Sequence, residues 1–170
     1  MLIIRGCPAL SGFRTEKILA SLRARCPTLQ RVYAEFVHFA DIDGTLRPAE
    51  SDRLQALLKY GSASSGRDLE SACLVVIPRP GTLSPWSSKA TDIVHNCGLS
   101  QVRRVERGTA WWMEGSAGAP LPAAETAGLK DLVHDRMTQS VIEHIGDADS
   151  LFAQRERGAR GPHPCKLMIE

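Results

Sequence analysis

The 170-residue sequence predicts an α+β fold of two sequential halves, with antiparallel sheets that carry their helices on one face. Three observations lead to this prediction. Apolar runs alternate with segments of helical periodicity, in the order β-α-β-α followed by β-α-β-α. The apolar runs are short and are bounded by Gly or Pro. The two halves have a similar make-up, which is typical of paired ferredoxin-like units.

The first half contains two expected strands and two expected helices. In chain order these are a strand at 2–4, a helix at 15–25, a strand at 32–39 and a helix at 50–60. Gly6 and Pro8 end the first strand, and the dipeptide Asp43-Gly44 forms a turn after the second. Gly61 is placed where a helix commonly stops.

The second half repeats this order. We expect a strand at 73–77, a helix from Ser87 or Ser88 to Cys97, a strand at 102–114 and a helix from Ala123 to about His144. Pro78 closes the first of these strands, because proline cannot donate to a ladder. The second strand is expected to be interrupted at Gly108. The last helix is the longest, with six apolar residues at helical spacing.

Composition and charge restrict the class of protein. A net charge of +2 and a hydrophobic fraction of 43% indicate an ordinary globular chain, with no nucleic-acid partner. The sequence has neither a signal peptide nor an apolar run of about 20 residues, so no membrane association is expected and the protein is assigned to the cytoplasm. The five cysteines lack any zinc-ligand spacing, and we expect reduced thiols and no metal site: Cys7, Cys26, Cys73, Cys97 and Cys165.

Domain organisation follows from the change in character near the C-terminus. Residues 1–146 are expected to form the folded domain, and residues 147–170 to form the start of a linker and an aberrant tail. Residues 154–165 lack periodicity and contain three arginines, which predicts a mobile segment.

The most informative stretch is the loop and helix start from Pro78 to Gly98. It contains the segment Leu-Ser-Pro-Trp-Ser-Ser-Lys-Ala-Thr, so that a helix N-terminus is crowded with hydroxyl groups and one lysine. Ser87, Ser88, Lys89 and Thr91 could bind an anion there. The alternative, which local reasoning favours, is that the serines cap the helix and Lys89 is solvated. The segment lacks the Gly-Lys-Ser/Thr ending of a Walker A loop.

As a whole, this segment resembles the signature of the large, single-chain phosphoribosylformylglycinamidine synthases. Five further segments lie where that family has similar ones: Arg5-Gly-Cys-Pro-Ala-Leu-Ser-Gly-Phe-Arg14, Tyr33-Ala-Glu-Phe-Val-His-Phe-Ala40, Leu57-Leu-Lys-Tyr-Gly61, Val105-Glu-Arg-Gly108 and His134-Asp-Arg-Met137. The resemblance covers about residues 1–153. It identifies the chain as similar to the N-terminal domain of those enzymes.

The resemblance implies a function in purine biosynthesis. The family enzyme converts formylglycinamide ribonucleotide to formylglycinamidine ribonucleotide with ATP, magnesium and glutamine. A synthetase domain and a glutaminase domain carry the chemistry. The N-terminal domain, similar to a dimer of the small subunit of multi-chain versions, bridges those two domains and helps to shape the route of ammonia.

The same resemblance implies that this chain holds no catalytic residue, no metal and no cofactor of its own. ATP and magnesium would be bound by the synthetase domain, and the chain alone is expected to be inactive. The sequence stops after the arginine-rich tail, so a product shortened by truncation or by a frameshift is expected. The expected interface and channel loop comprises Arg79, Ser84, Trp86, Ser87, Ser88, Lys89, Thr91 and His95.

An alternative function rests on the segment Asp41-Ile-Asp-Gly-Thr45, which matches the DxDGT motif of haloacid-dehalogenase-like phosphatases. Asp41 would be the nucleophile, Asp43 the general acid and magnesium the counter-ion. Lys89 or Lys130 would supply the later lysine, and Gly146-Asp-Ala-Asp149 the acidic metal motif. That fold requires parallel strands, whereas here Gly146 to Asp149 follow the longest expected helix.

Several other residues carry weaker expectations. His38 lies on a mostly apolar strand face and is expected to be a hydrogen-bonded structural histidine. For His95, a role at the helix C-terminus and a role at the interface remain equally open. Trp111 and Trp112 point to opposite faces, so one is expected in the core and the other at a contact surface. Three arginines are interpreted as solvated edge charges or as phosphate contacts, and the first interpretation is favoured: Arg103, Arg104 and Arg107.

Overall fold

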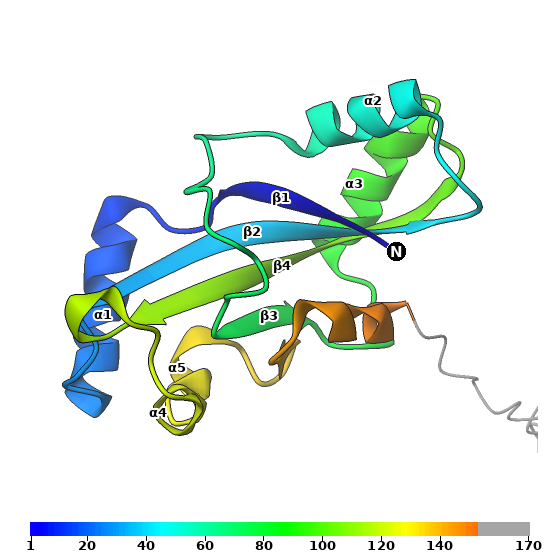
Figure 1. The fold of residues 1–170 in the computed structure, drawn as a ribbon. Helices are drawn as coiled ribbons and strands as arrows, with labels where there is room; N and C mark the ends of the chain where they lie inside the picture. Colours follow the sequence, from blue (N-terminus) through cyan, green and yellow to red (C-terminus); the bar gives the residue numbers. More distant parts are fainter. Residues whose placement is uncertain (153–170) are drawn as a thin grey trace, which may run out of the picture.

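Five strands join into one antiparallel sheet in the computed structural model, which describes residues 1–152 (Figure 1). The strands are β1 (Leu2–Pro8), β2 (Arg31–Ile42), β3 (Leu74–Pro78), β4 (Val102–Glu114) and β5 (Gln139–Ile142). The helices are α1 (Gly12–Arg25), α2 (Pro48–Leu58), α3 (Pro85–Asn96), α4 (Ala123–Ala127) and α5 (Lys130–Val133), with 3-10 turns η1 (Ser116–Gly118) and η2 (Ile145–Leu151). The order across the sheet is β1-β2-β4-β3-β5.

The α+β prediction with an antiparallel sheet is confirmed. The first half forms the unit β1-α1-β2 and the second forms β3-α3-β4, and each pair of strands is antiparallel. The two halves share one sheet, because β2 and β4 pair along almost their whole length, from Arg31 opposite Glu114 to Ile42 opposite Val102. The long central strands therefore hold the two halves together.

The helices α1 to α5 lie on one face of the sheet. Leu22 of α1 packs with Trp111 at one end of the central strands. Leu54 of α2 and Val94 of α3 pack with Val105 at the other end. Because side chains alternate between the two faces of a strand, every second residue of β2 and β4 faces the helices, and the two groups pack at different positions along these strands. Burying each of these leucines stabilises the fold by about 2 kcal/mol.

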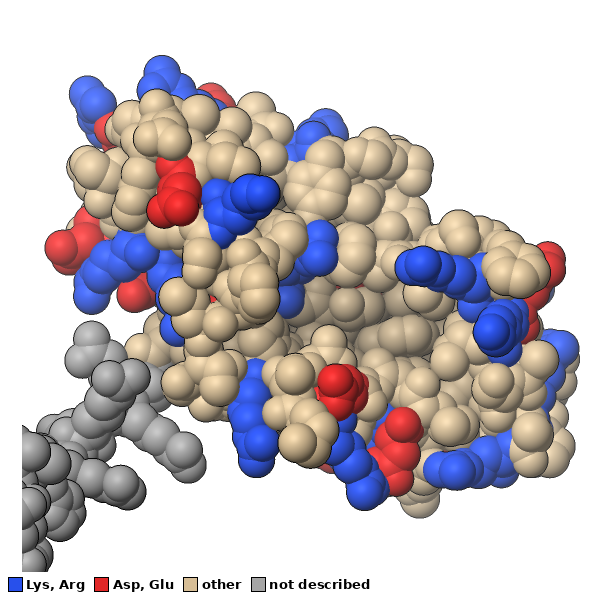
Figure 2. All heavy atoms as spheres, turned by 180° about the vertical axis from the view of Figure 1, so that it is seen from behind, with Lys and Arg blue, Asp and Glu red and all other residues tan. Residues whose placement is uncertain are grey.

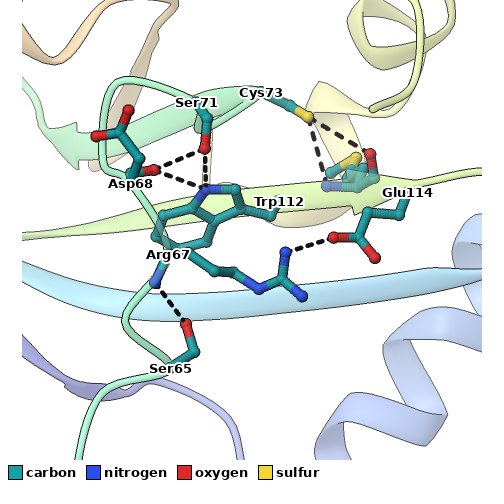
Figure 3. A network of polar contacts seen from close by, with 8 residues as sticks. Ser65, Arg67, Asp68, Ser71, Cys73, Trp112 and Glu114 are labelled. Carbon is teal, nitrogen blue, oxygen red and sulfur yellow. Dashed lines mark hydrogen bonds and ion pairs between the residues drawn. The ribbon is translucent and has the colours of Figure 1, made fainter. Parts of the chain in front are cut away.

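The opposite face is covered by the long loop between α2 and β3. Trp112 donates from Nε1 to the Asp68 carbonyl oxygen at 3.1 Å and to Ser71 Oγ at 3.2 Å (Figure 3). In the same loop, Arg67 forms an ion pair with Glu114 at the end of β4. These contacts fasten an otherwise irregular segment to the sheet.

The 3-10 turn η2 covers the rest of that face. Its residues Ala148 and Leu151 are buried in one apolar cluster with Phe39 and Ile77 of the sheet. Residues 147–152, which were expected to begin a linker, therefore pack on the sheet, and the division at residue 146 stays a prediction. The expected tail lies outside the described residues.

The predicted long helix from Ala123 to about His144 is wrong. The chain forms two short helices, α4 and α5, and then turns at Asp135, whose carboxylate accepts from the Met137 backbone N–H at 2.8 Å. Val141 pairs with Val76, so that β5 extends the sheet at its edge. The apolar residues at helical spacing pack in the core as far as Val133, whereas Met137, which continues this spacing, is 78% exposed. Edge pairing with β3 prevails over helical periodicity in the later residues.

Strand β4 confirms the expected strand at 102–114, without the expected interruption at Gly108. A Cβ at Gly108 would lie 2.7 Å from the Val76 carbonyl oxygen, so the glycine allows close approach of β3. Trp111 and Trp112 point to opposite faces as expected, but both are buried, and the expected contact surface at one of them is wrong.

The arginines of β4 lie on a stretch that pairs with β2, whereas the pairs between β4 and β3 involve only Thr109, Ala110 and Trp111. Arg103 contacts Asp41 and Asp43, and Arg104 forms an ion pair with the fully buried Glu106. The expected edge position therefore agrees with the strand register, but the expectation that these charges are only solvated is wrong for Arg103 and Arg104, because both are ion-paired.

Two further properties concern the described residues as a whole. Within residues 1–152, no helix has the length and apolarity that crossing a membrane requires. Free thiols occur at four positions, and Cys165 lies outside the described residues: Cys7, Cys26, Cys73 and Cys97.

Candidate functional site

Helix α3, which carries the signature segment, begins with a buried polar contact. Ser84 Oγ accepts a hydrogen bond from the Ser87 backbone N–H at 3.0 Å and donates one to Glu106 Oε2 at 2.9 Å. Because Ser84 is the N-cap, the helix begins at Pro85, earlier than the expected start at Ser87 or Ser88. A serine caps the helix as expected, but the predicted capping residue is wrong, since Ser84 and not Ser87 or Ser88 is the N-cap.

Further signature residues fasten α3 to β4. Thr91 Oγ1 accepts a hydrogen bond from the Val105 backbone N–H at 3.0 Å. His95 Nε2 lies 2.6 Å from the Val102 carbonyl oxygen. Ser87 is fully buried between the helix and the sheet. These three side chains are placed to position the helix, since each points toward the sheet or is enclosed by it.

Trp86 belongs to a group of aromatic and basic side chains in the middle of the helix-bearing face. We call this group the central cluster: Phe36, His38, Tyr60, Trp86 and Arg107. The rings of Trp86 and His38 are stacked with centroids 5.5 Å apart. The Arg107 Cζ atom lies 4.2 Å from the Phe36 ring centroid and 4.7 Å from that of Trp86. The guanidinium is therefore held against two aromatic faces, as in cation–π contacts.

Hydrogen bonds continue through the central cluster. Arg107 Nη1 donates to Tyr60 Oη at 3.2 Å, and Tyr60 Oη lies 2.8 Å from His38 Nε2. Since Tyr60 accepts from Arg107, its hydroxyl hydrogen is free to be donated to His38 Nε2. This arrangement requires a neutral His38 with an unprotonated Nε2.

The surroundings of His38 favour the neutral form. Burial lowers the pKa of His38 to about 4, and the positive charge of Arg107 acts in the same direction, while the backbone of Ile4 opposes the shift. The ring lies close to the backbone of β1, where a Cβ at Gly6 would be 2.8 Å from His38 Cε1. The expected hydrogen-bonded structural histidine is confirmed.

A groove lies beside the central cluster, between α2 and α3. Its volume is about 260 Å³, and apolar side chains form most of its lining. Trp86 and Tyr60 line it together with Lys89 and Ile93. Ile93 is 50% exposed, although it is a large apolar residue. Figure 2 shows the helix-bearing face, which is hollowed in the middle with several Lys and Arg side chains at the rim.

The structure does not bring all the expected loop residues together. Arg79 lies after β3, where its backbone N–H donates to the Thr138 carbonyl oxygen at 2.9 Å. Its guanidinium contacts the Met137 carbonyl oxygen at 3.4 Å. Ser88 is exposed on α3 and does not line the groove. Trp86 and Lys89 are thus the expected residues that face the hollow or its groove.

The other residues of the central cluster lie outside the expected interface and channel loop. Phe36, His38, Tyr60 and Arg107 each lie in one of the segments that resemble the synthase family, and so does Gly6. Strand pairing places His38 opposite Arg107, and the folding of α2 brings Tyr60 beside them. The presence of these residues in the family-like segments was the signal in the sequence that could have pointed to them. Their proximity in space depends on strand register.

The phosphatase interpretation does not agree with the geometry. All strand pairs of the described sheet are antiparallel, whereas that fold needs parallel strands. Asp43 forms an ion pair with Arg103, and Lys130 forms one with Glu143. Asp147 and Asp149 lie in η2, which packs on the face opposite α3. Within residues 1–152, no three His, Cys, Asp or Glu side chains are grouped to hold a metal ion.

Fold and site together define a small α+β domain whose polar groups mainly position its own elements, with one hollowed face left open. Residues 35–152 match the family described as formylglycinamide ribonucleotide amidotransferase N-terminal. Because the match spans more than half of the chain, the protein belongs to this family, which supports the role of an N-terminal domain of the synthase in purine biosynthesis.

Proposed function

We propose that this domain acts in assembly and has no covalent step of its own. In the ATP- and glutamine-dependent conversion of formylglycinamide ribonucleotide to formylglycinamidine ribonucleotide, it docks the synthetase and glutaminase domains and helps to shape the ammonia route. ATP and magnesium belong to the synthetase domain. The place of action is the cytoplasm.

The observation that carries this proposal is the groove between α2 and α3. Ile93 is half exposed beside Trp86. A partner that removes this side chain from water would stabilise the complex by about 25 cal/mol per Å² of apolar area buried. Lys89 adds a charge at the rim, which favours a specific orientation of the partner. Apolar centres with polar rims are typical of protein interfaces.

The test mixes the purified chain with a family synthase that lacks its own N-terminal domain. We expect co-elution and restored glutamine-dependent amination of formylglycinamide ribonucleotide. Ile93→Asp, which places a charge in the groove, should weaken association at least tenfold and lower turnover with it. Asp92→Asn, at an exposed neighbouring position outside the groove, is the matched control and should behave like the unmodified chain.

Two results would contradict the proposal. One is the absence of co-elution for the unmodified chain at micromolar concentrations. The other is equal association of the Ile93→Asp and Asp92→Asn variants, which would show that docking uses a different face. Trp86→Ala and Lys89→Ala in the full-length relative add a second measurement: both should lower glutamine-dependent turnover more than turnover with added ammonia.

A further inference from the structure

Arg107 differs from the other arginines of its strand in having no acidic partner among the described residues. Arg103 contacts the carboxylates of Asp41 and Asp43, and Arg104 contacts that of Glu106. Within residues 1–152, Arg107 forms no ion pair, and its one hydrogen bond goes to the neutral Tyr60 hydroxyl. A partly buried guanidinium without a counter-ion carries an uncompensated charge.

Two aromatic rings and one hydroxyl group contact this guanidinium. Phe36 and Trp86 hold it at 4.2 Å and 4.7 Å from their ring centroids. The Tyr60 hydroxyl engages Nη1, and the other N–H groups have no hydrogen-bond acceptor within the described residues. An immobilised guanidinium loses little further entropy on binding, and its planar fork matches two oxygens of a carboxylate or a phosphate.

The surrounding charges are favourable to an anion. His38 is neutral near pH 7, so it neither competes for an anion nor repels Arg107. Lys89 lines the adjoining groove with Trp86 and Tyr60 and forms no ion pair within the described part of the chain. Solvent reaches the cluster, since Tyr60 is 37% exposed and Arg107 and Trp86 are half-buried.

We propose that Arg107, in contact with the rings of Phe36 and Trp86, anchors a binding site for an oxyanion on the helix-bearing face. The ligand offers a carboxylate or a phosphate group to the free edge of the guanidinium. This site is independent of the docking role proposed above, because it is defined in the chain alone and is tested without any other domain.

The experiment follows the indole N–H resonance of Trp86 in the full chain by NMR, assigned with Trp86→Phe. Inorganic phosphate and acetate are titrated separately at constant ionic strength, with sodium chloride as the reference salt. We expect a saturable shift, because Trp86 stacks on the guanidinium that binds the anion. Saturation by phosphate alone assigns a phosphate ligand, and saturation by acetate alone assigns a carboxylate.

Arg107→Gln should abolish the shift or weaken binding at least tenfold. Arg103→Gln, on the same strand but already paired with aspartates, is the matched control and should bind as the unmodified chain does. If Arg107→Gln does not fold, as judged by circular dichroism, Arg107→Lys replaces it. The lysine variant keeps the charge but lacks the fork, so binding should weaken several-fold. A shift that follows ionic strength only, or equal binding in the Arg107 variants and the control, would overturn the proposal.

Discussion

His38 illustrates how a titratable residue is held in one protonation state by its neighbours. Its ring is fully buried, stacks on Trp86 and lies 2.8 Å from the Tyr60 hydroxyl. Protonation would place a charge next to Arg107 and would take away the acceptor that Tyr60 uses. The residue therefore supports the cluster only while it is neutral.

This environment predicts a dependence of stability on pH. Since the pKa of His38 is about 4 in the folded protein and 6.5 in its unperturbed state, the unfolded chain binds more protons between these values. The free energy of unfolding should fall as the pH is lowered from 6.5 to 4, by about 1 kcal/mol for each pH unit. Urea unfolding at pH 7, 5.5 and 4.5 measures this change.

The matched variant for this prediction is His38→Gln, which keeps an amide acceptor for Tyr60 but does not titrate. Carboxylates of lowered pKa, such as Glu50 and Asp135, lose stabilising contacts below about pH 5 in both proteins. The difference between the two pH profiles therefore isolates His38. Parallel profiles would show that His38 is not protonated on unfolding.

Among the elements, α3 depends most clearly on its first turn. Ser84 caps the helix and at the same time donates to Glu106, which is fully buried on β4. One hydroxyl thus connects the start of the signature helix to the central strand. The exposed Ser88, one turn further on, makes no such side-chain contact.

Replacing Ser84 by alanine should therefore be costly. Loss of the N-cap should lower the free energy of unfolding by about 1 kcal/mol. Loss of one hydrogen-bond donor to the buried Glu106 carboxylate should lower it by about 1–3 kcal/mol more. Ser88→Ala is the control, and it should change the free energy of unfolding by no more than about 0.5 kcal/mol. Chemical denaturation of both variants gives the comparison, and equal effects would contradict the role assigned to Ser84.

For the molecule as a whole, the two central strands, β2 and β4, each contribute to all three apolar clusters. Val32 of β2 belongs to the cluster under α1, Phe39 to the cluster under η2, and Ala40 to the cluster under α2 and α3. Unfolding of β2 would therefore expose every cluster at once. The two halves of the chain share their central sheet and should not unfold separately.

We accordingly expect a single cooperative unfolding transition. The tryptophans report on different clusters: Trp111 on the first, Trp112 on the second, and Trp86 on the edge of the third. Three variants that each keep one tryptophan, with the others changed to Phe, are unfolded in urea. Within each variant, fluorescence and far-UV circular dichroism should have the same midpoint. Different midpoints would indicate that the halves unfold independently.

The sequence by itself determined the α+β class, the strand at 102–114 and the family, because these depend on local periodicity and on ordered segments within the chain. The tertiary structure alone decided that Val141 pairs at the sheet edge instead of lying in a helix. It also decided that His38 faces Arg107 with Tyr60 and Trp86 beside them. Register and helix docking are set by contacts between residues far apart in the chain, and local patterns do not encode those contacts.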